Sequence, residues 1–281
     1  MSIATPCTPR TDEMGDRAGS QADARSLSLA TLACKAMDRS LLICGAHPDD
    51  ETFFAGSMAK YVSEGTRVSI ICGTRGERGA TADLCTIEEL PHVREAELRE
   101  SMRILGLHAE DLHFLPYQDQ KLIAAPLDEI RRQIVAIIRG VRPQVVISFD
   151  LYGSNGHPDH VAMSRFTCDA VAAAADPRWY PDTGSPFRVL RLLWAPPLHP
   201  WTLPPSTDIR IHEGVDFLID TKAWADQKSE AIRAYRTQLP GIKTLFFENG
   251  SPDYTLHQEG FRTAFGPRPA ALPSRDLFED L

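Results

Sequence analysis

The 281-residue sequence has no apolar run that approaches the roughly 18 to 20 residues of a membrane-spanning helix. Its six cysteines form no CxxC pair and no regular spacing, so neither a zinc ribbon nor a disulfide scaffold is predicted. Cysteines of this kind favour a reducing, cytoplasmic compartment. The formal net charge of -8 would on balance repel a phosphate backbone. Neither nucleic acid nor a membrane span is therefore expected.

One short segment has some features of an export signal. Residues 26–34, with the sequence SLSLATLAC, follow arginines and end in a cysteine, as lipoprotein signals do. The segment is short, rich in serine and threonine, and lies behind a long polar leader. Export is therefore not the expectation.

The composition changes twice along the chain. Residues 1–38 are polar without strong periodicity, which predicts a mobile leader. From residue 39 to 265, short apolar runs alternate with helical patterns, which is typical of one α/β domain at this length. Residues 266–281 are rich in proline and charge and predict a lightly ordered tail.

The periodicity of apolar residues predicts where strands and helices lie. The expected strands are residues 41–46, 68–72, 112–115, 145–149, 189–194 and 209–219. The expected helices are residues 52–64, 88–105, 126–140, 160–175 and 222–238. This order predicts a Rossmann-like, doubly wound, mostly parallel sheet with helices on both faces, plus a smaller C-terminal extension of strands and a helix.

Two histidine–carboxylate clusters follow predicted strands. His47, Asp49 and Asp50 come directly after the first strand, and His157 and His160 come shortly after the strand that ends at residue 149. Ligands of open α/β sheets bind beyond the carboxyl ends of the strands, so the two clusters are expected to meet. Either cluster alone is better explained by a turn or a helix cap. Together they supply the nitrogen and oxygen donors of a catalytic zinc site, with a carboxylate left over to accept a proton from water. The residues alone do not rank Asp49 against Asp50 for these two roles.

The two motifs, AHPDDE at residues 46–51 and HPDH at residues 157–160, resemble those of the PIG-L/LmbE-like family of metal-dependent de-N-acetylases. The resemblance extends over about residues 40–175. It includes the loop TRGERG at 74–79 and the pair Arg94 and Glu97 in the following helix. It implies hydrolysis of an amide, by N-deacetylation, on an N-acetylglucosamine-type or related N-acyl substrate, expected to be an amino-sugar conjugate.

The resemblance also implies the ligands of the metal. Carried over position by position, they are His47, Asp50 and His160. Zinc is the expected metal, although two histidines and one aspartate also accept iron, cobalt or manganese.

The resemblance further implies that Asp49 is the general base. It accepts a proton from the activated water and delivers it to the leaving nitrogen. His157, oriented by Asp159, would steady the oxyanion.

Three residues form the expected substrate-binding set: Arg94, Asp119 and Asn155. Arg94 aligns with a substrate contact, but a helix-surface arginine paired with a neighbouring glutamate is an equal alternative. Asp119 aligns likewise and is also a plausible turn former. Asn155 stands where the mycothiol-pathway relatives have a tyrosine, and Tyr235 stands where the family often has a histidine. These departures argue against the mycothiol substrate and leave the leaving-group pocket open.

Three other functions compete with deacetylation of a sugar. An amidase acting on a thiol conjugate or another N-acyl compound would use the same residues. A metal-binding relative without catalysis is disfavoured, because it would not need Asp49. A nicotinamide-dependent oxidoreductase is disfavoured as well, because the glycines at 73, 76 and 79 match neither a dinucleotide fingerprint nor a P-loop. The sequence does not predict the oligomeric state.

Overall fold

A computed structural model of the chain describes residues 39–195, 215–248 and 252–281. The predicted leader, residues 1–38, lies outside the described residues, and so does the first half of the strand expected at 209–219. No helix among the described residues has the length and apolar character needed to cross a bilayer.

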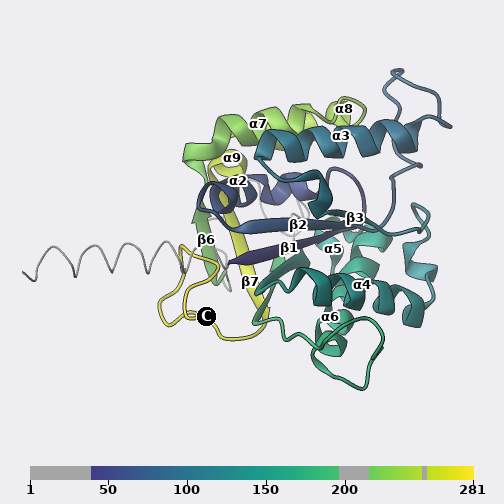
Figure 1. The fold of residues 1–281 in the computed structure, drawn as a ribbon. Helices are drawn as coiled ribbons and strands as arrows, with labels where there is room; N and C mark the ends of the chain where they lie inside the picture. The colour runs from purple at the N-terminus through teal and green to yellow at the C-terminus, as the bar shows by residue number, and fades with distance from the viewer. Residues whose placement is uncertain (1–38, 196–214, 249–251) are drawn as a thin grey trace, which may run out of the picture.

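In the described part of the chain the sheet has seven strands, in the order β3-β2-β1-β4-β5-β7-β6 (Figure 1). The strands are β1 (Ser40–Gly45), β2 (Arg67–Cys72), β3 (Leu112–Phe114), β4 (Val145–Phe149), β5 (Arg191–Ala195), β6 (Phe217–Asp220) and β7 (Gln258–Phe265). The first five are parallel, and β7 runs antiparallel between β5 and β6. The chain moves outward from β1 through β2 to β3, then returns to the other side of β1 as β4. A topological switch point, where such folds bind ligands, therefore lies between β1 and β4.

Helices cover both faces of the sheet. In Figure 1, α2, α3, α7, α8 and α9 lie on one side, and α4 and α6 lie on the other. Their bounds are α2 (Ala55–Ser63), α3 (Leu90–Leu105), α4 (Leu127–Val141), α6 (Pro158–Ala175), α7 (Ala225–Arg233), α8 (Leu239–Phe247) and α9 (Pro252–His257). The shorter helical segments are η1 (Asp50–Phe54), η2 (Ala109–Asp111), η3 (Leu122–Ala124), α5 (Gly153–Gly156) and η5 (Lys222–Trp224). The predicted fold class is confirmed.

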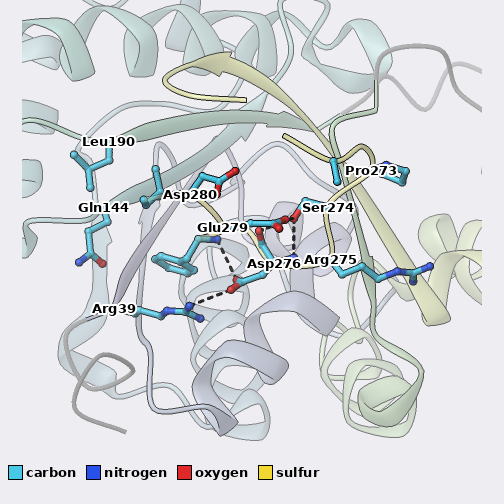
Figure 2. A pocket seen from close by; sticks show the side chains of 12 residues that line it. Arg39, Gln144, Leu190, Pro273, Ser274, Arg275, Asp276, Glu279 and Asp280 are labelled. Atoms are coloured by element: carbon cyan, nitrogen blue, oxygen red, sulfur yellow. Dashed lines mark hydrogen bonds and ion pairs between the residues drawn. The ribbon is translucent and has the colours of Figure 1, made fainter. Parts of the chain in front are cut away.

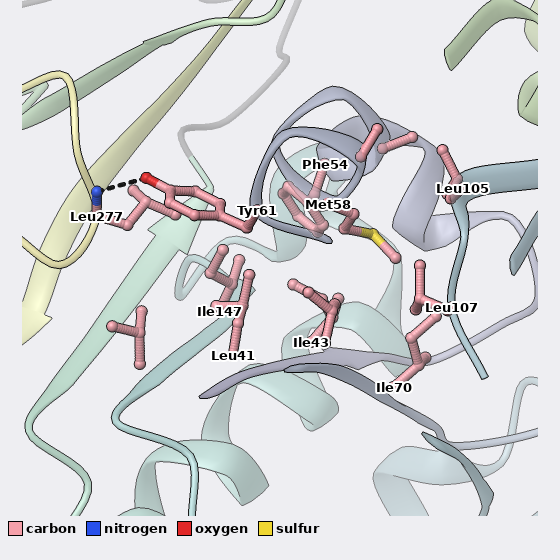
Figure 3. Packing of buried hydrophobic residues seen from close by; sticks show 14 of the residues in the cluster. Leu41, Ile43, Phe54, Met58, Tyr61, Ile70, Leu105, Leu107, Ile147 and Leu277 are labelled. Carbon is pink, nitrogen blue, oxygen red and sulfur yellow. Dashed lines mark hydrogen bonds between the residues drawn. The ribbon is translucent and has the colours of Figure 1, made fainter. Parts of the chain in front are cut away.

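The two faces of the sheet give two apolar cores because the central strands are apolar on both sides. Every residue of β1 is buried. Leu41 and Ile43 point to one face and pack with Met58 of α2 and Ile147 of β4, as Figure 3 shows. Leu42 points to the other face, where α4 and α6 pack. β1 is thus fixed from both sides, which gives the residues that follow it a rigid base.

Several predicted boundaries and elements differ from the structure. The helix expected at 52–64 begins with the 3-10 turn η1, and the helix expected at 222–238 ends at Arg233. A separate helix, α8, begins at Leu239 with Pro240 in its first turn. The spacing of apolar residues did not predict this helix. Strand β7 was not predicted. Its sequence, QEGFRTAF, has little strand character of its own, and it is extended because it pairs with β5 and β6.

The C-terminal segment, residues 266–281, packs on the domain, whereas the sequence predicts a lightly ordered tail. Leu277 is fully buried, and its backbone N–H donates to Tyr61 Oη at 2.7 Å (Figure 3). Arg191 of β5 is also buried and donates to the backbone oxygens of Pro267, Leu277 and Glu279, at 3.0, 2.6 and 2.8 Å. The composition of the segment did not indicate these anchors, because they depend on two distant residues, Tyr61 and Arg191.

Replacing Arg191 by Met is expected to lower the free energy of unfolding by about 3 kcal/mol, because three backbone oxygens lose a charged donor. Urea denaturation of the two proteins measures the difference. Arg178→Met is the control, since Arg178 is exposed and its side chain binds, among the described residues, only the neighbouring Asp176. Equal stability of the Arg191 variant and the native protein would contradict the anchoring role.

Candidate active site

The site lies at the carboxyl ends of β1 and β4, where the sheet order switches. The turn from β1 into η1 carries His47, Asp49 and Asp50, and the loop from β4 into α6 carries His157 and His160. The structure therefore brings together the two clusters that the sequence placed at one sheet edge.

Three side chains, those of His47, Asp50 and His160, meet at the centre of this site. His47 Nδ1 lies 3.2 Å from His160 Nε2, and His160 Nε2 lies 3.1 Å from Asp50 Oδ1. The other oxygen of this carboxylate, Asp50 Oδ2, lies 3.7 Å from His47 Nδ1. A tetrahedral zinc with bonds of roughly 2.0 to 2.1 Å holds its ligand atoms about 3.4 Å apart. The three side chains thus supply two imidazole nitrogens and a carboxylate, and His160 Nε2 lies near this distance from both of its neighbours.

Neighbouring groups fix the orientation of two of these donors. Asp50 Oδ2 accepts the backbone N–H groups of Ala46 at 2.7 Å and His47 at 2.8 Å. His160 Nδ1 donates to the Gly153 oxygen at 3.1 Å, so the lone pair of Nε2 faces the site. The His160 ring also stacks on Phe149 of β4, with centroids 4.1 Å apart.

The imidazole of His47 is held from behind by two carboxylates. His47 Nε2 lies 3.0 Å from Asp119 Oδ1 and 3.3 Å from Asp159 Oδ2, which directs Nδ1 towards the site. Burial disfavours the imidazolium, but these carboxylates and Asp50 outweigh it and raise the pKa of His47 to about 10. A metal at Nδ1 would therefore bind in exchange for a proton.

Among the described residues, two groups other than the proposed ligands place one donor atom of each residue close enough together to hold a metal. One is His47 with His157 and His160, and the other is His47 with Asp119 and Asp159. In the second group the carboxylates already accept backbone N–H groups, from Arg78 to Asp119 and from residues 120 and 122 to Asp159. We interpret these two aspartates as supports of His47. Which residues bind the metal stays a prediction.

Asp49 lies beside this triad in an unusual backbone conformation, with φ of 109°. Its carboxylate lies 3.1 Å from Arg94 Nη2. Burial raises the pKa of Asp49 to about 6; the positive charge of Arg94 opposes the shift, and the negative charge of Asp50 adds to it. A carboxyl group with this pKa is suited to exchange a proton near neutral pH.

Arg94 is buried, which excludes the alternative of a helix-surface arginine. It is 3% exposed and donates to the backbone oxygens of Gly76, at 2.9 Å, and Pro48. Gly76 has φ of +64°, and a Cβ there would lie only 2.0 Å from Arg94 Nη1. The glycine-rich loop and the turn that carries Asp49 are therefore joined through this guanidinium. Whether Arg94 contacts substrate stays a prediction.

His157 is half-buried, and its ring stands edge-on to that of His47, with centroids 4.8 Å apart. Its Nδ1 accepts the backbone N–H of Asp159 at 3.2 Å. The Asp159 carboxylate faces His47 and the N–H groups of residues 120 and 122, whereas we expected it to orient His157. Burial and the two nearby histidines lower the pKa of His157. Asn155 is exposed, and its Oδ1 accepts the backbone N–H of His157 at 3.0 Å.

The sequence assigned no role to Glu51, and it singled out Tyr235 only as a departure from the family. Both are buried behind Asp49. Glu51 Oε1 accepts Tyr235 Oη at 2.5 Å and Ser101 Oγ at 2.9 Å, and Glu51 Oε2 accepts the Asp49 N–H at 3.2 Å. Burial raises the pKa of Glu51 to about 7, although both hydroxyl groups oppose the shift. Only the AHPDDE motif pointed to Glu51, and no local pattern connects it with Tyr235.

A cavity of about 880 Å³ lies at the opposite edge of the sheet, near the amino ends of β1, β4 and β5 (Figure 2). Its lining includes Arg39 and Asp276, which form an ion pair of 3.0 Å. It contains no histidine or cysteine. Its lining therefore lacks the imidazole donors that meet at the carboxyl ends of β1 and β4.

The chain is similar to known proteins over the part of the sequence that carries His47 to His160. A model of the family described as PIG-L, GlcNAc-PI de-N-acetylase, matches residues 42–171. A protein of Geodermatophilus obscurus named 1D-myo-inositol 2-acetamido-2-deoxy-alpha-D-glucopyranoside deacetylase is 32% identical over 288 residues, covering 83% of this chain and 94% of its own length.

Two solved structures are similar over most of the chain. A conserved protein of Thermus thermophilus is 31% identical, with a TM-score of 0.64, covering 81% of this chain and 95% of its own. The N,N'-diacetylchitobiose deacetylase of Pyrococcus horikoshii has a TM-score of 0.63 and 21% identity, covering 89% and 94%. The second likeness supports the fold alone.

Proposed function

Because this chain belongs to the PIG-L family of de-N-acetylases, we propose that it hydrolyses the acetamide of an N-acetylglucosamine-type substrate, with His47, Asp50 and His160 as metal ligands. The observation that carries the proposal is the convergence of these three side chains beside Asp49, a partly buried carboxyl group with a raised pKa. The other two side chains of the five-residue site, Asp49 and His157, then flank the reacting amide.

Zinc is the metal we propose, because two imidazoles and one carboxylate form the kind of three-ligand set that leaves a fourth position of a catalytic zinc for water. When bound, zinc would polarise the amide carbonyl and lower the pKa of that water. Iron, cobalt and manganese accept the same donors, so metal analysis decides among them.

The protein's own side chains would move the protons. Asp49 accepts a proton from the attacking water and returns it to the nitrogen as the C–N bond breaks. His157, on the other side of the site, donates a hydrogen bond to the oxyanion that forms when the new C–O bond is made. The products are acetate and a free amine.

The proposed substrate rests on the relatives. The Geodermatophilus protein is named for a 2-acetamido-2-deoxy-glucopyranoside of inositol. Asn155 and Tyr235 differ from the mycothiol-pathway pattern, and the group attached to the sugar is therefore the variable to test. Arg94, Asp119 and Asn155 remain the proposed substrate-binding residues.

The test is an assay of primary-amine release, combined with metal analysis of the purified protein. The substrates are N-acetylglucosamine, its inositol conjugate, N,N'-diacetylchitobiose, an N-acyl thiol conjugate and a larger amide. We expect the purified protein to contain zinc and to release amine from one or more of the acetylated sugars. If only the thiol conjugate or the larger amide releases amine, the substrate is another N-acyl compound and not an acetylated sugar. No release from any of them by the loaded protein would contradict the function.

The charge of Arg94 predicts a pH effect. Asp49 acts as a base only when ionised, so activity falls as the pH falls through its pKa, about 6. Arg94 favours the ionised form, and Arg94→Met is therefore expected to raise that pKa. Relative to the native enzyme, Arg94→Met should therefore lose on the order of tenfold more kcat/KM at pH 6 than at pH 8.

Arg94→Lys is the matched control because lysine keeps the positive charge and lacks the planar guanidinium group. Its pH profile should keep the acidic limb of the native enzyme, even if the whole curve is lower. An unchanged limb in Arg94→Met would mean that Arg94 does not tune Asp49.

We also propose the cytoplasm as the compartment. The four cysteines among the described residues, Cys44, Cys72, Cys85 and Cys168, are free. A small secreted domain would more often pair them. Fractionation of cells that express the full chain tests this assignment.

A further inference from the structure

The backbone of Asp49 is held in a conformation that aspartate rarely adopts. Its φ of 109° lies in the region that favours glycine. The Asp49 oxygen accepts the Thr52 N–H at 3.0 Å and Thr52 Oγ1 at 2.6 Å, and its carboxylate lies beside Arg94. Its N–H has one described partner, Glu51 Oε2. Such a conformation persists only when its surroundings fix it, and each polar group of Asp49 is indeed bound.

Glu51 is itself fixed from two distant parts of the chain. Ser101 lies in α3, and Tyr235 follows the end of α7. Both residues are fully buried, and both donate to Glu51 Oε1. The other oxygen is thereby left to face the Asp49 N–H. This carboxyl group is too deep to meet a substrate, because its residue is 3% exposed and three protein donors surround it.

We infer that Glu51, anchored by Ser101 and Tyr235, is a positioning residue that holds Asp49 in its left-handed conformation. It acts on the backbone, while Arg94 acts on the side chain. The inference rests on the proposed role of Asp49 as the general base. Displacing a reacting group by a fraction of an ångström affects turnover more than binding, so Glu51 governs kcat rather than KM.

The first test is Glu51→Leu, which keeps the approximate volume and removes both acceptor oxygens. We expect kcat to fall by about 10- to 100-fold, with KM within about twofold and the metal content unchanged. Glu51→Gln should recover part of the loss, because its amide oxygen can accept the Asp49 N–H while its NH₂ group donates to the hydroxyl of Tyr235. A residue that only fills space would give the native kcat with leucine, and that result would overturn the inference.

If Glu51→Leu does not fold, the double variant Ser101→Ala, Tyr235→Phe decides. It leaves Glu51 intact and removes only its anchors, so a kcat at least about fivefold lower supports the inference and a native kcat overturns it. Ser57→Ala is the control, because this buried hydroxyl in α2 has no hydrogen-bond partner among the described residues. Asp49→Asn is measured alongside. If the native, metal-loaded protein releases no amine, the proposed function has failed. If Asp49→Asn is fully active, the proposed base role has failed and this inference with it; if Asp49→Asn is inactive and Glu51→Leu is normal, only this inference has failed.

Discussion

Asp49→Asn is expected to lower kcat/KM by about 10²- to 10⁴-fold while leaving the bound metal in place, because it removes the general base and no proposed ligand. The fold should be unaffected. Asparagine occupies the left-handed region more readily than most residues, and its oxygen still accepts a hydrogen bond from Arg94. The measurement is a steady-state assay on protein whose metal content has been determined.

The matched control is Asp280→Asn. Asp280 is an exposed aspartate with φ of 63°, and it lines the cavity at the opposite edge of the sheet (Figure 2). Its replacement makes the same chemical change in a similar conformation, so activity should stay at the native level. Loss of metal from Asp49→Asn would show that the roles of Asp49 and Asp50 are reversed.

The sequence predicted the parts of the fold that depend on local patterns. The apolar runs of β1, β2 and β4 and the spacing of Ile130, Ile134 and Ile138 in α4 are properties of short segments, and the structure has these elements within a few residues of the predicted bounds. The meeting of the two histidine clusters was predicted as well, since it follows from parallel strands whose carboxyl ends share an edge.

Contacts between distant residues could not be predicted in this way. Tyr235 lies 184 residues from Glu51 in sequence, and neither its type nor its surroundings indicates that it donates to a carboxyl group. Arg191 likewise looks like an ordinary strand residue, yet it anchors the C-terminal segment. In both cases the tertiary fold gives a polar side chain a partner that local sequence patterns do not predict.

The orientation of His47 is a third example. The HPDH motif suggested that Asp159 serves its near neighbour His157, two residues away. The structure instead turns the Asp159 carboxylate towards His47, together with Asp119. A carboxylate at the start of a helix can face either side of it, and only the packing of the segment at residues 119–122 decides which. Sequence spacing therefore located the site better than it assigned the supporting contacts.

Asp50→Asn and His160→Ala are each expected to weaken zinc binding by at least about 100-fold and to abolish most activity, because each removes a proposed ligand. Removal of an outer support typically costs about 10- to 100-fold, so a direct ligand should exceed that range. Competition with a chelator of known affinity measures the change, and metal analysis after dialysis checks it. Retention of zinc by either variant would exclude that residue as a ligand.

His157→Ala separates the proposed triad from the alternative group of His47, His157 and His160. If His157 only steadies the oxyanion, this variant keeps its zinc and loses about 10²- to 10³-fold in kcat. If His157 is a ligand instead of Asp50, His157→Ala loses zinc and Asp50→Asn keeps it. Asp119→Asn is the intermediate case. It leaves the three donors in place and weakens only the support of His47 Nε2, so zinc affinity should fall less than in His160→Ala, by about 10- to 100-fold.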